Sequence, residues 1–109
     1  MESVKVFGWN VGDTASYGDA PTEQDIEASY AAFLESEGKR PQRQVQCRCG
    51  TADIVTEDAV YEVKRDLDRN ALYRAIGQVL LYRMAINPVA APKIVTNQIL
   101  FPREMIRAA

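Results

Sequence analysis

The sequence places two carboxylates and a lysine on a short hairpin of otherwise apolar residues. The stretch TADIVTEDAVYEVK, residues 51–64, reads as two apolar runs joined by an acidic turn. An antiparallel register centred between residues 57 and 58 pairs Asp53 with Glu62, with Cβ atoms about 5 Å apart, and places Lys64 on the same face. Opposed like charges destabilise a sheet unless a cation lies between them, and carboxylates suit Mg²⁺ or Mn²⁺. The pattern predicts a metal site beside a lysine, and the alternative is a solvated outer sheet face.

A second pair of polar residues follows on the next predicted helix. Gln78 and Tyr82 are four residues apart in GQVLLYR, so they share one helical face, with Arg74 a turn earlier. The apolar residues around them predict a helix that buries two faces, one against the sheet and one against a second subunit or the N-terminal arm. A buried Gln and Tyr need hydrogen-bond partners. These partners are either a functional site or simply each other and the backbone.

The elements that must position these residues alternate in a recognisable order. Thr22 and Asp25 resemble a capping box that opens a helix ending at Gly38. Beyond it we expect strands at about 43–49, 51–56 and 59–64, a helix at about 66–87, a strand at 93–101 and a short terminal helix at 102–109. Residues 1–20 read as an irregular arm in which VKVFGW could form one short strand. The order αβββαβ predicts an α/β fold with a helical crossover between strands.

Composition narrows the class of protein. The chain has 109 residues, of which 47% are hydrophobic and 26% charged, and its net charge is -2. We expect an arm at 1–20 and one globular domain at 21–109. The net charge gives no overall attraction to nucleic acid or to anionic lipid, so such binding would need a local basic patch. There is no apolar run of membrane-spanning length and no signal-peptide pattern, which predicts a cytoplasmic protein without membrane contact.

The two cysteines lie one residue apart in QCRC. Because the chain has no histidine and no second cysteine pair, Cys47 and Cys49 do not suffice for a tetrahedral zinc site within one chain. They read as small half-buried thiols beside a sheet. A zinc site shared across a dimer is the alternative.

Together, Asp53, then Glu62-Val63-Lys64, then Gln78-x-x-x-Tyr82 resemble the PD-(D/E)XK nuclease superfamily. The likeness is to the restriction-endonuclease-like fold, and in particular to its small RecB-type and Holliday-junction-resolvase-like members. It extends from about Thr22 to Phe101, although Ala52 stands where a proline often precedes the aspartate. The resemblance implies an αβββαβ core with a mixed four-stranded sheet flanked by helices.

The resemblance also implies a Mg²⁺-dependent deoxyribonuclease, with Mn²⁺ as a substitute. In that reading Asp53, Glu62 and the Val63 carbonyl bind the metal, and Lys64 orients or helps to deprotonate the attacking water. Gln78 would position the lysine, a water or the phosphate. A glutamate from the first helix often joins such sites, and Glu23 fits the family spacing best, with Glu27 as second choice. The alternative for Glu23 is a first-turn acid favoured by the helix dipole.

Basic residues near these positions suggest the substrate. Nine of the 13 lysines and arginines lie between residues 39 and 83, which makes a local groove for DNA credible. The predicted contacts to nucleic acid are Tyr82, Arg74, Arg65 and Arg48. A domain this small favours structure-selective or weakly sequence-selective cleavage, as in DNA repair or recombination, and a homodimer. The competing readings are a catalytically silent module that binds nucleic acid or protein, and a purely structural dimerisation domain.

Overall fold

A computed structural model describes residues 3–11 and 21–100. The predicted terminal helix at 102–109, and most of the predicted arm, lie outside these residues. The elements follow one another as β1 (Lys5–Gly8), α1 (Glu23–Ser36), β2 (Gln42–Cys47), β3 (Gly50–Val55), β4 (Ala59–Leu67), α2 (Arg69–Ile86) and β5 (Ala91–Ile99). The predicted α/β class and the order of elements from α1 onward are confirmed.

The sheet has five strands, so the prediction of four was too low. Its order is β1-β5-β4-β3-β2, with β1 and β4 parallel to β5 and the β2, β3 and β4 neighbours antiparallel. The additional strand is β1, which aligns Phe7 with Val95 of β5. Its four residues carry only a weak strand pattern of their own, because an edge strand is stabilised mainly by the neighbour it pairs with.

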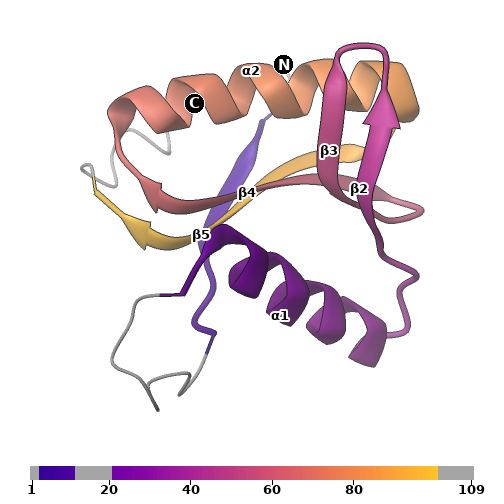
Figure 1. Cartoon of the computed structure of the whole chain (residues 1–109). Helices are drawn as coiled ribbons and strands as arrows, with labels where there is room; N and C mark the ends of the chain where they lie inside the picture. The colour runs from indigo at the N-terminus through magenta and orange to yellow at the C-terminus, as the bar shows by residue number, and fades with distance from the viewer. Residues whose placement is uncertain (1–2, 12–20, 101–109) are drawn as a thin grey trace.

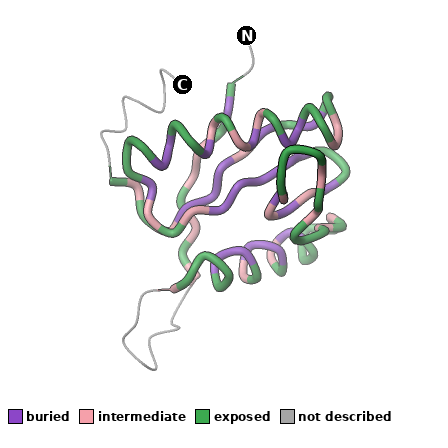
Figure 2. Tube along the Cα trace, turned by 45° about the horizontal axis from the view of Figure 1, so that its top comes forward, coloured by how far each residue is buried: buried purple, intermediate pink, exposed green. Residues whose placement is uncertain are grey.

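Helices cover both faces of the sheet (Figure 1). α2 lies over one face and forms a core with residues such as Val60 and Ile94. α1 lies over the other face, where Tyr30 and Leu34 pack against Tyr61 and other strand residues. In Figure 2 the buried residues line the central strands and the helix surfaces that face them. The result is a three-layer α/β/α arrangement in which β4 carries side chains to both cores.

Local signals define the first helix as expected. The Thr22 hydroxyl accepts from the Asp25 N–H at 3.1 Å, and the Asp25 carboxylate accepts from the Thr22 N–H at 2.9 Å, which completes the capping box. At the other end Gly38 has φ of +83°, the left-handed conformation that ends helices. Because α1 begins at this cap, its first turns lie beside the sheet.

The second helix begins later than the sequence pattern suggested. Asp66 and Leu67 continue β4, and the Asp68 side chain caps α2 by accepting from the Ala71 N–H at 2.8 Å. Within the described residues α2 buries one broad stripe, and the expected second buried face, against a second subunit or the N-terminal arm, stays a prediction. Its outer side exposes Tyr73, Leu81 and Met84.

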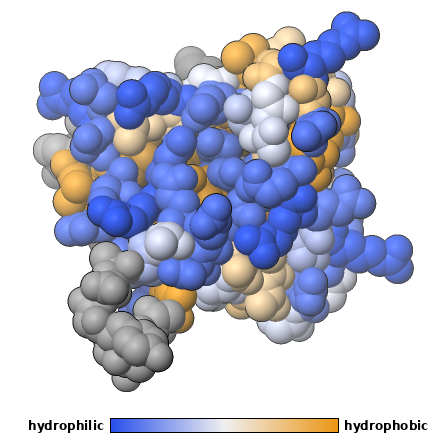
Figure 3. All heavy atoms as spheres, in the orientation of Figure 1, coloured by the Kyte–Doolittle hydropathy of each residue, from blue (hydrophilic) through white to orange (hydrophobic). Residues whose placement is uncertain are grey.

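The surface seen in Figure 3 is mostly hydrophilic, with hydrophobic atoms in small separate groups. None of the described helices is long and apolar enough to cross a membrane.

Candidate functional site

The predicted hairpin register is confirmed where the strands pair. Ile54 pairs with Tyr61 and Val55 with Val60. One residue further, the strands separate: Oδ2 of Asp53 accepts a hydrogen bond from the Val63 N–H at 2.8 Å. A side chain therefore takes the place that a backbone carbonyl would fill in a continued ladder. Asp53 lies at a fork between β3 and β4.

Glu62 is buried close to Asp53 and to a lysine. It is 4% exposed, and its Oε2 lies 3.5 Å from the Lys64 ammonium. Burial first, and then the charge of the Asp53 carboxylate, raise the pKa of Glu62 to about 8, which Lys64 offsets only in part. The two carboxylates therefore interact, and the lysine stands beside them. The predicted direct pairing of Asp53 with Glu62 is not part of the strand register, which ends at Ile54 and Tyr61.

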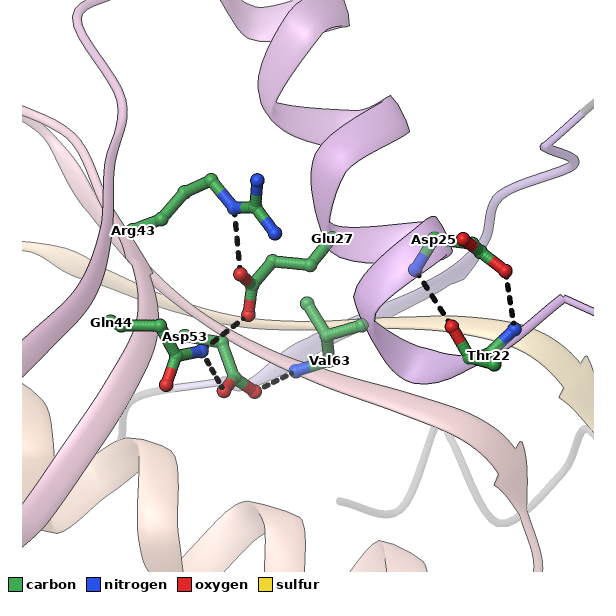
Figure 4. A network of polar contacts seen from close by, with 7 residues as sticks. All are labelled: Thr22, Asp25, Glu27, Arg43, Gln44, Asp53 and Val63. Atoms are coloured by element: carbon green, nitrogen blue, oxygen red, sulfur yellow. Dashed lines mark hydrogen bonds and ion pairs between the residues drawn. The ribbon is translucent and has the colours of Figure 1, made fainter.

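On the α1 side of the sheet, a polar network joins the first helix to Asp53 (Figure 4). The Glu27 carboxylate is buried, with Oε2 accepting from Nε of Arg43 at 2.7 Å and Oε1 accepting from Nε2 of Gln44 at 2.7 Å. The same Gln44 nitrogen donates to Oδ1 of Asp53 at 3.3 Å. Gln44 thus bridges a helix carboxylate and a strand carboxylate.

The backbone at Gln44 is unusual. Its φ of +53° makes it the one non-glycine residue with positive φ in the described ranges, a conformation that costs about 1 kcal/mol or more and is enriched at functional sites. Sequence reasoning did not select it. In the register of β2 and β3, Arg43 pairs with Ile54 and Val45 pairs with Ala52. Gln44 therefore lies opposite Asp53. The register rule that pairs β3 with β4, applied to β2 and β3, predicts the position of Gln44 opposite Asp53 from the sequence.

A cleft of about 280 Å³ opens at this network, lined by Glu23, Gln24, Glu27, Gln44, Asp53 and Val63. Both first-helix glutamates therefore reach the candidate site. Glu27 is buried and linked to Asp53 through Gln44, whereas Glu23, the preferred choice from sequence, is exposed. The geometry favours Glu27, one helical turn further on than expected.

The α2 residues approach from the other face. Strand alternation puts Glu62 and Lys64 on the same side of β4 as Val60, which packs under α2. Oε1 of Gln78 is buried without a hydrogen-bond partner. Tyr82 is 8% exposed, and its pKa is raised by burial first and then by the charge of Glu62, with smaller contributions from the cysteines and Asp53. Tyr82 therefore lies within electrostatic reach of both acids.

The predicted arginine contacts lie at the surface. Arg48, Arg65 and Arg74 are all exposed. Nε of Arg65 pairs with the Asp66 carboxylate at 3.0 Å. In the described residues no hydrogen bond or ion pair joins these arginines to Asp53 or Glu62, whereas the fold brings together the acids, Lys64 and the α1 network.

The donor atoms at the fork fit a hard divalent cation. Oε1 of Glu62 is buried with no hydrogen-bond partner, and the carboxylate oxygens of Asp53 keep lone pairs beyond those used by Val63 and Gln44. Among residues 3–11 and 21–100 no three His, Cys, Asp or Glu side chains converge on one point. A cation here would take two carboxylates, a backbone oxygen and waters, which is a set that Mg²⁺ accepts.

Comparison of the chain with family models, with characterised proteins and with solved structures finds no match. The fold defines an α/β protein with a five-stranded mixed sheet between two helices.

Proposed function

We propose that this protein is a metal-dependent nuclease that hydrolyses phosphodiester bonds of DNA. The observation that carries the proposal is the fork between β3 and β4. There the buried Glu62, with an unpartnered oxygen, interacts with Asp53 and lies 3.5 Å from the Lys64 ammonium. Two acids and a lysine in this arrangement suit phosphoryl transfer better than they suit stability, since buried like charges cost free energy. The likeness of these residues to the PD-(D/E)XK motif supports the same reading.

Each residue at the fork has a defined task in this proposal. Asp53 and Glu62, with the Val63 carbonyl, would hold Mg²⁺, which when bound supplies charge neutralisation and an acidified water. Lys64 would stabilise negative charge that develops on the phosphate. Because Glu62 holds the Lys64 ammonium at 3.5 Å, the lysine would stand beside a metal-bound phosphate.

The α2 and α1 residues would position that core. Gln78 offers an amide whose buried oxygen has no partner and which could bind a water or turn its nitrogen toward phosphate. Tyr82, a buried residue of α2, would border the site on that side. Glu27 and Gln44 hold Asp53 from the α1 side. Exposed Arg48, Arg65 and Arg74, together with Tyr82, remain the candidates for contacts to the DNA backbone, and a homodimer would extend the surface available to DNA.

The decisive experiment compares matched variants on defined substrates. Single-stranded, duplex and branched DNA, and RNA, are incubated with the protein in Mg²⁺ or Mn²⁺. We expect DNA cleavage that falls at least about 100-fold in Asp53→Asn and Lys64→Met. The asparagine retains an oxygen for the Val63 N–H, so the fork should stay folded.

Two surface variants serve as controls. Glu57→Gln removes an exposed acid from the tip of the same hairpin and Lys5→Met removes an exposed lysine from β1, and both should retain full activity. Equal cleavage by Asp53→Asn, Lys64→Met and the wild type would disprove the site. Tight DNA binding without cleavage under either metal would instead identify a catalytically silent binding module.

A further inference from the structure

The two cysteines of the chain form a contact pair that the proposed nuclease site does not use. Cys47 is the last residue of β2, and Cys49 lies in the turn that leads into β3. Their sulfur atoms are 3.5 Å apart, and both thiols are free. The expected half-buried position beside the sheet is confirmed for Cys47 and wrong for Cys49, which is exposed in the turn.

The pair is close to disulfide geometry. A disulfide needs an S–S distance of about 2.05 Å and Cα atoms within roughly 7 Å. Consecutive Cα atoms are about 3.8 Å apart, and a tight turn shortens the distance between residues two apart in sequence. Such residues therefore meet the Cα condition. Bond formation therefore requires the two sulfur atoms to close from 3.5 Å to about 2.05 Å.

The two thiols differ in access. Cys49 is exposed, whereas Cys47 is half-buried and packs against the core under α2. An oxidant in solution therefore reaches Cys49 first, and Cys47 is placed to react with the oxidised sulfur. Cys49 is thus the accessible thiol and Cys47 the thiol placed to resolve its oxidised form. Burial first, and then the hydrogen bond with Cys47, raise the pKa of Cys49, so its oxidation should be slow at neutral pH and faster in alkaline solution.

The turn also touches a residue of the candidate site. A Cβ placed on Gly50 would lie 2.8 Å from the Tyr82 hydroxyl, so the tyrosine packs directly against the backbone that follows Cys49. The charge of either cysteine raises the pKa of Tyr82. Formation of a disulfide in this turn would therefore alter backbone that Tyr82 contacts.

We propose that Cys47 and Cys49 are a reversible redox pair that closes into an intrachain disulfide when the protein meets a peroxide. The Cys49 sulfur attacks the peroxide O–O bond and becomes a sulfenic acid, releasing one water. The Cys47 sulfur then attacks the Cys49 sulfur, the S–S bond forms and a second water leaves. Two thiols lose two electrons and two protons, and hydrogen peroxide is reduced to two molecules of water. A dithiol reductant reverses the change by exchange.

The test is a mass measurement on the full chain. Reduced protein is treated with hydrogen peroxide at about pH 8.5, where more of the thiol is ionised, then alkylated with N-ethylmaleimide without reduction. EDTA is present throughout. We expect a monomer lighter by two hydrogen atoms that accepts no alkyl group, and two alkyl groups after treatment with dithiothreitol. Hydrogen exchange should change mainly across the β2–β3 turn.

Single variants assign the two roles. Cys47→Ser should stop at a Cys49 sulfenic acid that dimedone traps, and Cys49→Ser should oxidise more slowly, because its remaining thiol is half-buried. Circular dichroism confirms that both variants fold. Because peroxide also adds oxygen to methionines such as the exposed Met84, the cysteine products are read on the peptide that contains residues 47–49. The proposal is overturned if oxidation adds oxygen atoms to that peptide, links two chains or leaves both wild-type thiols open to alkylation. A parallel alkylation without EDTA tests for a bound metal, and thiols that are protected there but open in EDTA would also overturn the proposal. None of these readouts depends on nuclease activity.

Discussion

At the scale of single residues, Glu62 is a buried carboxylate in an unfavourable electrostatic environment. It is buried beside Asp53 with one oxygen unpartnered, and Lys64 at 3.5 Å compensates only partly. A protein that only needed a stable hairpin would gain by a neutral residue here. The arrangement therefore costs stability, which is the expected cost of the metal site proposed above.

The raised pKa of Glu62 predicts that the stability of the metal-free protein depends on pH. The folded pKa of Glu62, about 8, lies above its unfolded value, so the folded state binds more protons between about pH 4.5 and pH 8. The free energy of unfolding should fall as pH rises through that window, by roughly 2–4 kcal/mol. Urea unfolding in EDTA at several pH values measures this change.

Glu62→Gln removes the titrating group and should flatten the dependence. Glu57→Gln, at the exposed tip of the same hairpin, should keep the wild-type slope. The acid Asp58 does not interfere, because its pKa is lowered by hydrogen bonding to Lys39 and it titrates below the window. A slope unchanged by Glu62→Gln would show that Glu62 titrates normally.

At the scale of elements, the β2–β3 hairpin decides how the site is assembled. Gln44 and Gly50 both have positive φ, and each lies where the hairpin meets another element. Gln44 joins α1 to the fork through Glu27 and Asp53. Gly50 lets α2 approach, since the Tyr82 hydroxyl occupies the space that a side chain would need. The hairpin therefore contacts both helices at the candidate site.

Substituting Gly50 tests this close approach. Gly50→Ala should lower the free energy of unfolding by about 1–3 kcal/mol, because an alanine at φ of +142° is strained and its Cβ would clash with the Tyr82 hydroxyl at 2.8 Å. Adding Tyr82→Phe should recover only part of this loss, since ring atoms of Tyr82 remain within 3.3 Å. Urea unfolding of the single and double variants gives the coupling.

Gly77→Ala is the matched control. Gly77 lies within α2 with nothing within 4 Å of an added Cβ, so alanine should stabilise the helix by about 0.5–1 kcal/mol. A Gly50→Ala variant with an unchanged free energy of unfolding would show that the turn relaxes away from Tyr82.

At the scale of the whole molecule, the N-terminal segment is part of the fold. β1 adds a fifth strand beside β5. The indole N–H of Trp9, just beyond it, donates to the Ser29 hydroxyl at 3.0 Å, and its ring meets Tyr30 edge-on at 5.0 Å. The α1 face of the sheet is thus completed by residues that the sequence pattern assigned to an arm.

Deletion of residues 1–11 should therefore destabilise the domain. Loss of β1 uncovers the edge of β5, and loss of Trp9 leaves the aromatic cluster on α1 open, which together should cost roughly 3 kcal/mol or more. Thermal and urea unfolding followed by circular dichroism measure the loss. Lys5→Ala, on the exposed side of β1, should have little effect. An unchanged unfolding midpoint for the deletion would mean that residues 12–109 fold independently of this segment.

Local chemistry was enough to predict much of the fold. The capping box at Thr22 and Asp25, the stop at Gly38 and the pairing of Ile54 with Tyr61 depend on residues near one another in the chain. Helix caps and hairpin registers are decided by such short-range hydrogen bonds and by side-chain alternation. For the same reason the proximity of Asp53, Glu62 and Lys64 was visible from the amino-acid order.

Only the tertiary structure decided the rest. β1 pairs with β5 across most of the chain, and Glu27 rather than Glu23 connects to Asp53 because Gln44 adopts a left-handed backbone opposite it. The approach of Tyr82 to Gly50 likewise depends on how α2 packs over the sheet. Such contacts join residues far apart in sequence, and their free energy comes from the packing of whole elements, which no local pattern of residues encodes.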